Sequence, residues 1–200
     1  MTDRIPVAPA AHYTVGGVKT DLTGRTNIPH LYVCGELASS GIMGANRLAS
    51  NSLIECLVFG KRAVEDSVRN RREDPIPETM PLFSLDREKL DAYLSLKNKV
   101  ADIMTQEAGI IRTENGLQEG LETLLRLEQT EIFEENEYYS LVSKNLLTVA
   151  ELIIRSALFR KESRGGHFRS DYPTPNDDYV CHIIQQKGKE IKTTPVILNN

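Results

Sequence analysis

Three closely spaced prolines most constrain how this chain can fold. Pro75, Pro77 and Pro81 forbid a regular helix, because proline lacks a backbone N–H and clashes with the preceding helical turn. The sequence pattern changes at the same place, from short apolar runs bounded by turn residues to long helical repeats. We therefore expect a linker here, with one domain spanning residues 1–80 and a second spanning residues 81–200.

The region after the prolines predicts three amphipathic helices. Asp86 and Thr113 carry side-chain oxygens suited to N-caps, and the third helix begins near Tyr138 and runs to Gly165–Gly166. Leucines recur at helical spacing in each of these segments. Short connections between such helices favour an antiparallel bundle. The residues from Asp177 onward alternate weakly between polar and apolar and predict a short β ribbon.

An anion-binding pattern lies in the first region. Small uncharged residues surround Arg47, whose planar guanidinium suits a carboxylate. Either Ser50 or Asn51 is a natural N-cap for the helix that follows, and the first N–H groups of such a helix attract anions. The same pattern also begins ordinary helices that bind nothing. The apolar residues of this helix recur on one face: Leu53, Ile54, Leu57 and Val58.

Two segments further upstream carry candidate ligand-binding side chains. Leu31–Cys34 is a short apolar run typical of a buried strand of a parallel sheet, and Glu36 follows at the end where α/β sheets bind ligands. Gly16-Gly17 permits a turn or a close backbone approach just after His12. From spacing alone, a single histidine more often packs or is solvated, and a single strand-end glutamate more often faces water.

Together these segments closely resemble the succinate dehydrogenase/fumarate reductase flavoprotein family over nearly the whole chain. The motifs are His-Tyr-x-x-Gly-Gly beginning at His12, strand-Gly-Glu ending at Glu36, and Gly-Ala-Asn-Arg ending at Arg47. The run Ala49–Ser52 is more similar to the aspartate oxidase branch than to the succinate dehydrogenases. Met43 departs from the histidine that relatives commonly carry there. The resemblance implies an α/β fragment of a Rossmann-like FAD-binding domain, followed by an all-α three-helix bundle and a tail.

The resemblance also implies an activity and a set of site residues. The activity is FAD-dependent oxidation of L-aspartate to iminosuccinate, the first step of quinolinate and NAD biosynthesis, with FAD bound non-covalently. His12 and Arg47 are expected to hold the dicarboxylate substrate. The residues expected to contact the flavin are Glu36, Asn51, Ser52 and Leu53. No catalytic residue is assigned, since the family's proton-transfer arginine has no counterpart in these residues.

One further motif matches the family. Residues 162–173 fit its Glu-Ser-Arg-Gly-x-His-x-Arg-x-Asp-x-Pro pattern, which lies at a domain interface there. The charged residues of this segment are therefore expected to dock one domain onto another. A helix end whose cations suit the negative end of the helix dipole is the simpler alternative.

The sequence lacks one part of the expected machinery. No Gly-x-Gly-x-x-Gly follows a strand, so the loop that binds the pyrophosphate of a dinucleotide is absent. We therefore expect the chain to be the C-terminal portion of a longer enzyme, inactive alone, whose partners are its own N-terminal part and quinolinate synthase. The alternatives are a succinate dehydrogenase or fumarate reductase flavoprotein subunit and, from another class, a helical protein-interaction module.

Composition narrows the remaining classes. A net charge of −4 argues against nucleic-acid binding, which normally requires a basic face. No apolar run approaches the roughly 20 residues that span a bilayer. Cys34, Cys56 and Cys181 form no C-x-x-C pair, which suits reduced thiols in a cytoplasm better than disulfides or a metal site.

Overall fold

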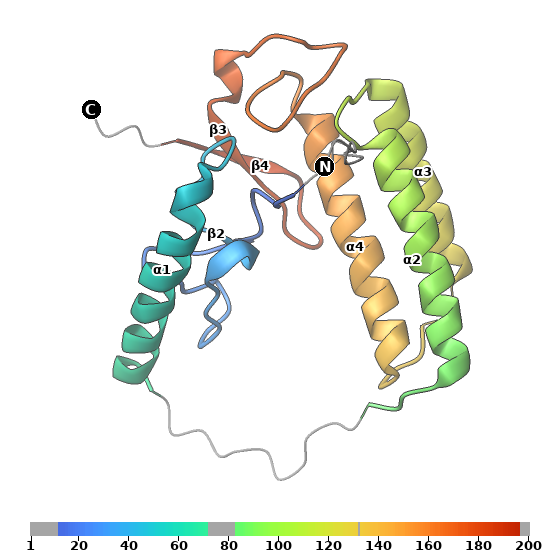
Figure 1. Cartoon of the computed structure of the whole chain (residues 1–200), viewed down its shortest axis with the longest axis horizontal. Helices are drawn as coiled ribbons and strands as arrows, with labels where there is room; N and C mark the ends of the chain where they lie inside the picture. Colours follow the sequence, from blue (N-terminus) through green and yellow to red (C-terminus); the bar gives the residue numbers. More distant parts are fainter. Residues whose placement is uncertain (1–11, 72–82, 132, 197–200) are drawn as a thin grey trace, which may run out of the picture. The chain divides into compact units, whose positions relative to one another are not determined.

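The chain divides into two compact units, Met1–Pro77 and Glu78–Asn200, in a computed structural model that describes residues 12–71, 83–131 and 133–196 (Figure 1). The boundary predicted near residue 80 lies outside the described residues. Among the described segments, every helix is too short or too polar to span a lipid bilayer.

Three helices make up the body of the second unit: α2 (Arg87–Glu107), α3 (Glu114–Thr130) and α4 (Tyr138–Phe159). Successive helices run in opposite directions, as the bundle prediction requires (Figure 1). Both predicted N-caps are confirmed. The Asp86 carboxylate accepts from the Glu88 N–H at 2.9 Å, and the Thr113 hydroxyl accepts from the Gly116 N–H at 3.1 Å. Local side-chain chemistry thus sets where α2 and α3 begin.

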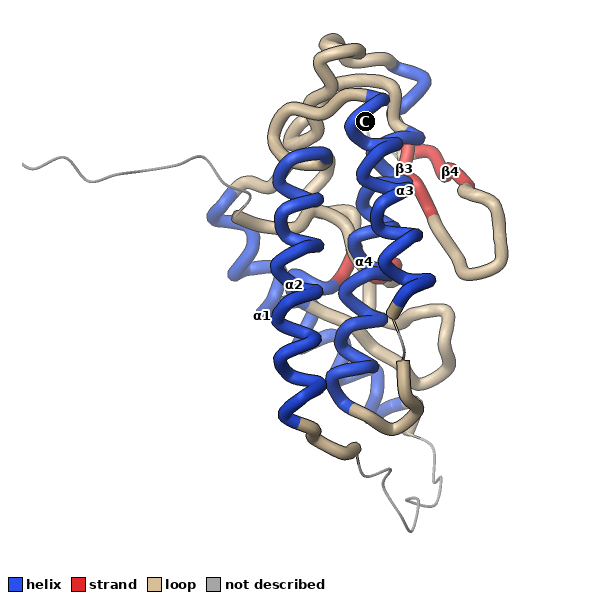
Figure 2. The backbone as a smooth tube through the Cα atoms, turned by 90° about the vertical axis from the view of Figure 1, so that its right-hand side faces the viewer, coloured by secondary structure: helices blue, strands red, loops and turns tan. Residues whose placement is uncertain are grey.

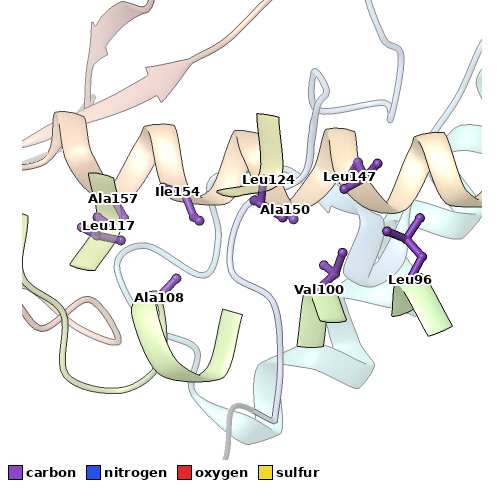
Figure 3. Close-up of a cluster of buried hydrophobic side chains, with 9 residues drawn as sticks. All are labelled: Leu96, Val100, Ala108, Leu117, Leu124, Leu147, Ala150, Ile154 and Ala157. Atoms are coloured by element: carbon purple, nitrogen blue, oxygen red, sulfur yellow. The ribbon is translucent and has the colours of Figure 1, made fainter. Parts of the chain in front are cut away.

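A single apolar cluster fills the space between these helices. Figure 3 shows Leu147 and Ile154 on α4, lying opposite Leu117 and Leu124 of α3. Leu117 and Ile154 are 0% exposed, and burial of one such side chain contributes roughly 1.5–3 kcal/mol. The full cluster is Leu96, Val100, Ala108, Leu117, Leu124, Leu147, Ala150, Ile154 and Ala157.

Helix α4 ends earlier than predicted, at Phe159 rather than at Gly165–Gly166. The cause is Glu162, whose buried carboxylate accepts from Arg160 at 2.5 Å and from Arg164 at 3.0 Å. Residues two apart do not face each other on a helix. A glutamate that binds an arginine two positions away on either side therefore requires a non-helical backbone.

The predicted ribbon is present after this loop. A short 3₁₀ turn, η2 (Asp177–Tyr179), precedes β3 (Cys181–Ile184), which pairs antiparallel with β4 (Lys192–Pro195) (Figure 2). The Gln185 side-chain amide donates to the Leu152 carbonyl at 2.8 Å and to the Ser156 hydroxyl at 2.7 Å. These bonds attach the ribbon to α4.

In the first unit, the predicted strand at Leu31–Cys34 is wrong. Tyr32 makes only an isolated antiparallel bridge to Arg25, and Val33 is the buried residue of the run. A strand requires a hydrogen-bonded neighbour along its length, whereas the chain beside this segment is a turn whose Gly24 carbonyl accepts from the Val33 N–H. The segment is therefore held at single points and does not form a strand.

Parallel pairing occurs instead between two very short strands. These are β1 (Val18–Lys19) and β2 (Ala38–Ser39), in which Val18 lies opposite Ala38. The 3₁₀ turn η1 (Gly35–Leu37) leads directly into β2. The predicted close backbone approach at Gly16-Gly17 is confirmed, because Gly17 has φ +129° and a Cβ there would overlap the Leu37 carbonyl. Glycine at this position lets β1 lie against the chain that carries Glu36.

Helix α1 (Ala49–Arg69) differs from the prediction at its start. It begins at Ala49 with Leu48 as N-cap residue, so Ser50 and Asn51 lie in its first turn and neither is the N-cap. Its apolar residues share one face, as predicted, and that face is exposed, with Leu53 at 70% and Leu57 at 66%. The face that the unit buries is the other one: Glu55, Phe59, Ala63 and Asp66.

Candidate functional site

A partly buried ion pair fixes α1 against the loop that precedes η1. The Arg25 guanidinium binds both oxygens of Asp66, at 2.5 and 2.7 Å, and the Tyr32 hydroxyl donates to the same carboxylate at 2.8 Å. The hydrogen bonds from Arg25 lower the pKa of Asp66, so that this carboxylate stays charged. This bidentate contact attaches the last turns of α1 to the loop that contains Arg25.

The first turn of α1 offers backbone donors without a side-chain cap. Leu48 has no side-chain acceptor to cap the N–H groups of Ala49 and Ser50, whereas the Asn51 N–H is satisfied by the Leu48 carbonyl at 2.9 Å. The N-terminal end of a helix carries a partial positive charge, which stabilises a negative group placed there. Three predicted flavin contacts, Asn51, Ser52 and Leu53, lie in this turn, and the Leu53 side chain is exposed.

Arg47 lies just before this turn, and its guanidinium has two partners. Its Nη1 donates to the Ser52 hydroxyl at 3.0 Å, and its Cζ lies 4.2 Å from the centroid of the Tyr13 ring. The side chain is half-buried. The loop that delivers it turns at Gly44, which adopts φ +59°. The Arg47 guanidinium is thus held by one of its five N–H groups and by one face.

The segment His12–Thr14 brings the predicted substrate and cofactor residues together. Tyr13 lies under Arg47, and the Thr14 N–H donates to Glu36 Oε1 at 2.9 Å. His12 is exposed and directly precedes Tyr13. One continuous segment therefore touches the arginine expected to bind substrate and the glutamate expected to bind flavin.

Several acidic groups surround the Tyr13 phenol. Burial, and then the Glu55 and Glu36 carboxylates, raise the pKa of Tyr13 above its ordinary value of 10.0, while Arg47 acts in the opposite direction. Glu55 is itself buried and accepts a hydrogen bond from the Ser40 hydroxyl. Tyr13 is therefore neutral at physiological pH, and its ring faces the Arg47 guanidinium as an uncharged π surface.

The residues of this site fit one end of a flavin. Glu36 is exposed, and a carboxylate is an acceptor suited to ribityl hydroxyls. The uncapped first turn of α1 supplies N–H donors suited to the electron-rich edge of the ring. The pyrophosphate has no matching Gly-rich loop in this sequence. The fit therefore covers the ring and ribityl portion only.

The motif at residues 162–173 forms a separate charged cluster within the second unit. Arg169, which is fully buried, binds Asp171 at 2.6 Å and Glu114 at 3.0 Å and donates to the Ala157 carbonyl at 3.0 Å. The hydrogen bonds from Arg169 lower the pKa of Asp171 to about 2. These contacts tie the end of α4 to the start of α3. The predicted docking of one domain onto another stays a prediction.

Sequence reasoning missed two residues that shape the first site. Asp66 lies in the charged second half of α1, and nothing in its spacing distinguishes it from a solvated carboxylate. Tyr13 stands in the His-Tyr-x-x-Gly-Gly motif, but the motif by itself predicts no contact for its tyrosine. The sequence feature that could have indicated the contact of Tyr13 with Arg47 is an aromatic residue beside the histidine expected to bind substrate, since guanidinium groups stack readily on aromatic faces.

Known protein families match both regions of this chain. A family model described as "Fumarate reductase flavoprotein C-term" matches residues 97–200, and one described as "FAD binding domain" matches residues 1–53. The L-aspartate oxidase of a Nostoc species is 40% identical over an alignment 214 residues long, and the alignment covers 92% of this chain and 37% of that protein. The L-aspartate oxidase of Acinetobacter baylyi is 38% identical, covering 97% of this chain and 37% of that protein.

The fold is also similar to that of a solved flavoprotein structure. The quinol fumarate reductase of E. coli is similar with a TM-score of 0.76 and 28% sequence identity, covering 98% of this chain and 38% of that one. This chain therefore spans little more than a third of the length of the relatives that it matches.

Proposed function

Because the chain belongs to the fumarate reductase flavoprotein C-terminal family, we propose that it forms part of an FAD-dependent oxidase that converts L-aspartate to iminosuccinate. The observation that carries the proposal is the contact of one segment with both halves of the site, through Tyr13 to Arg47 and through Thr14 to Glu36. The aspartate oxidase relatives, at 38–40% identity over most of this chain, support the choice of substrate.

Two residues bind the substrate carboxylates in this proposal. Arg47 offers two N–H groups to one carboxylate of L-aspartate, and His12 donates to a carboxylate from the neighbouring segment. Together they orient the Cα–H of the substrate, which is a positioning effect. When bound, FAD accepts the two electrons released as the amine becomes an imine. Glu36 holds the ribityl hydroxyls, and the first turn of α1, from Asn51 to Leu53, lies against the ring.

The same proposal assigns a role to each region of the chain. Residues 1–80 form the C-terminal portion of a Rossmann-like FAD-binding domain with a linker, and residues 81–200 form the helical domain. The exposed apolar face of α1, which includes Leu53 and Leu57, fits this assignment, because a helix of an α/β domain normally covers a sheet with such a face. The partners in this proposal are the N-terminal part of the same enzyme and quinolinate synthase, in the cytoplasm.

A succinate-oxidising or fumarate-reducing flavoprotein is the second candidate. The similarity to the E. coli quinol fumarate reductase, at a TM-score of 0.76, favours it. Both candidates use a dicarboxylate and a flavin, so the geometry around Arg47 serves either one. They differ in whether the substrate carries an amine.

The test compares the two substrates directly. The native polypeptide that carries this chain is purified and assayed with L-aspartate and with succinate, using oxygen and a dye as alternative electron acceptors. Oxidation of L-aspartate with much weaker oxidation of succinate is the expected result. The reverse preference supports the second candidate, and failure to oxidise either dicarboxylate, with FAD bound, overturns both.

A further inference from the structure

We propose that Tyr13 is a positioning residue for Arg47, holding the guanidinium in the plane in which it grips a substrate carboxylate. The proposal rests on the proposed function, since it takes Arg47 as the carboxylate-binding residue. It adds Tyr13 to His12 and Arg47, the two residues expected to act on the substrate. The observation behind it is the 4.2 Å separation between the Arg47 Cζ and the centroid of the Tyr13 ring.

An arginine in this loop needs an external restraint. The residues before Arg47 are small and lie exposed, from Gly44 to Asn46, so the loop supplies few contacts that fix the side chain. An arginine side chain has about 2 kcal/mol of rotamer entropy to lose when it is ordered. A bidentate bond to a carboxylate forms with full strength only if the guanidinium plane is already aligned.

Tyr13 and Ser52 restrain two different motions of this plane. The Tyr13 ring has the Arg47 Cζ over it, 4.2 Å from its centroid, and opposes movement of the guanidinium toward and away from the ring. The Ser52 hydroxyl accepts from Nη1 at 3.0 Å and opposes rotation within the plane. The contact with the ring occupies none of the guanidinium N–H groups, and Ser52 accepts from one of the five, so the others are available to a carboxylate in this proposal. The two restraints together define the direction from which a carboxylate binds.

The interaction depends on the ring and not on the phenol oxygen. Burial, and then the Glu55 and Glu36 carboxylates, raise the pKa of Tyr13, so the phenol is neutral. The electrostatic attraction of a cation to a π face is present in phenylalanine as well as in tyrosine. Tyr13→Phe therefore retains the restraint, whereas Tyr13→Leu fills similar space without a π face and loses it.

The experiment uses the native polypeptide with its FAD and measures the KM for L-aspartate. A cation–π contact is worth about 0.5–2 kcal/mol, so Tyr13→Leu is expected to raise this KM about two- to thirtyfold, with FAD content unchanged. Tyr13→Phe should stay within about twofold of the wild type. Tyr138→Leu, at an exposed tyrosine of α4, is the matched control and should leave the KM unchanged.

A double-mutant cycle separates positioning from a general structural effect. If Tyr13 acts through Arg47, Tyr13→Leu changes the KM far less in an Arg47→Lys background than in the wild type. Additive effects of the two substitutions overturn the proposal, as does a Tyr13→Phe variant as impaired as Tyr13→Leu. If Tyr13→Leu does not fold, Tyr13→Met replaces it in the same cycle.

Succinate binding keeps this test separate from the proposed function. It is followed by the change in the visible flavin spectrum, which requires no turnover. A wild type that binds succinate but does not oxidise L-aspartate contradicts the proposed function, while the effect of Tyr13→Leu on succinate affinity still decides the role of Tyr13. Unchanged succinate affinity in Tyr13→Leu overturns the positioning role alone.

Discussion

Arg47 is the residue on which the substrate assignment depends most. Its guanidinium is stacked on Tyr13 and bonded to Ser52, so its shape matters as much as its charge. Arg47→Lys keeps the charge but loses the fork and the planar face. We expect this variant to weaken L-aspartate binding by about 2 kcal/mol, which raises the dissociation constant roughly thirtyfold.

The matched control for that variant is Arg69→Lys, an exposed arginine in the last turn of α1. It should leave L-aspartate binding unchanged, because no proposed ligand contact involves it. Wild-type affinity in Arg47→Lys removes Arg47 from the substrate site. Equal weakening in both variants assigns the effect to lost helix stability.

The surroundings of His167 lead to a second prediction, which concerns the stability of the protein and not ligand binding. Its Nδ1 accepts from the Arg112 guanidinium at 2.8 Å, so the proton lies on Nε2, which bonds to the Arg160 carbonyl at 3.1 Å. Burial lowers the pKa of His167 below its ordinary value of 6.5, and the nearby Arg112, Arg160 and Arg169 charges lower it further. Protonation breaks the bond from Arg112.

The sign of the pH effect follows from this lowered pKa. Near pH 6.5 the unfolded chain binds the proton more readily, so the free energy of unfolding falls as the pH drops from 6.5 through the folded-state pKa. His167→Gln should flatten this decline, measured by urea unfolding from about pH 8 to about pH 5. His182→Gln, at an exposed histidine of β3, should keep the wild-type slope. Identical slopes in all three proteins exclude His167 as the cause.

The sequence supplies candidate site residues, whose ligand-binding roles stay predictions, but it does not give the contacts between them. His12, Glu36 and Arg47 were identified because each stands in a short pattern with a chemical reason for its residue type. The stack of Tyr13 on Arg47 joins residues 34 positions apart, and no local rule sets such a distance.

Among the helices and strands, the first residues of helices were predicted better than the last ones. Asp86 and Thr113 were correctly identified as N-caps, because a cap is decided by a side chain and the backbone two or three residues away. The strand predicted at Leu31–Cys34 and the end of α4 were wrong, because each depends on partners distant in sequence.

The junction of α3 and α4 supplies a prediction about stability. Arg169 is fully buried and neutralises Glu114 and Asp171 while satisfying the Ala157 carbonyl. Arg169→Met removes the buried guanidinium from both carboxylates and from the Ala157 carbonyl, leaving Asp171 with the Glu114 N–H and Glu114 with Lys161. We expect it to lower the free energy of unfolding of the helical unit by about 3 kcal/mol or more. Urea unfolding followed by circular dichroism measures this change.

The control for that substitution is Arg126→Met, at an exposed arginine of α3 that contacts only a threonine hydroxyl among the described residues. It should change the free energy of unfolding by about 0.5 kcal/mol or less. A similar small change in Arg169→Met contradicts the structural role given to the buried charged cluster.

At the scale of the whole molecule, the site reaches only part of the cofactor. In the proposed function Glu36, Ser52 and Leu53 serve only the ring and ribityl portion, and the sequence contains no Gly-rich loop for the pyrophosphate. We therefore expect the 200-residue chain by itself not to retain FAD through gel filtration and not to oxidise L-aspartate. A yellow, active preparation of these residues alone contradicts this division of the cofactor site.

The most direct test of the central claim compares His12→Ala with Glu36→Gln in the native polypeptide. The claim is that one segment joins a substrate-binding residue to a cofactor-binding one, because Thr14 bonds to Glu36 and Tyr13 contacts Arg47. FAD content and L-aspartate turnover are measured for both variants. His12→Ala should keep its FAD and lose most turnover, whereas Glu36→Gln should lose FAD affinity. Loss of FAD in His12→Ala together with full FAD retention in Glu36→Gln contradicts the claim.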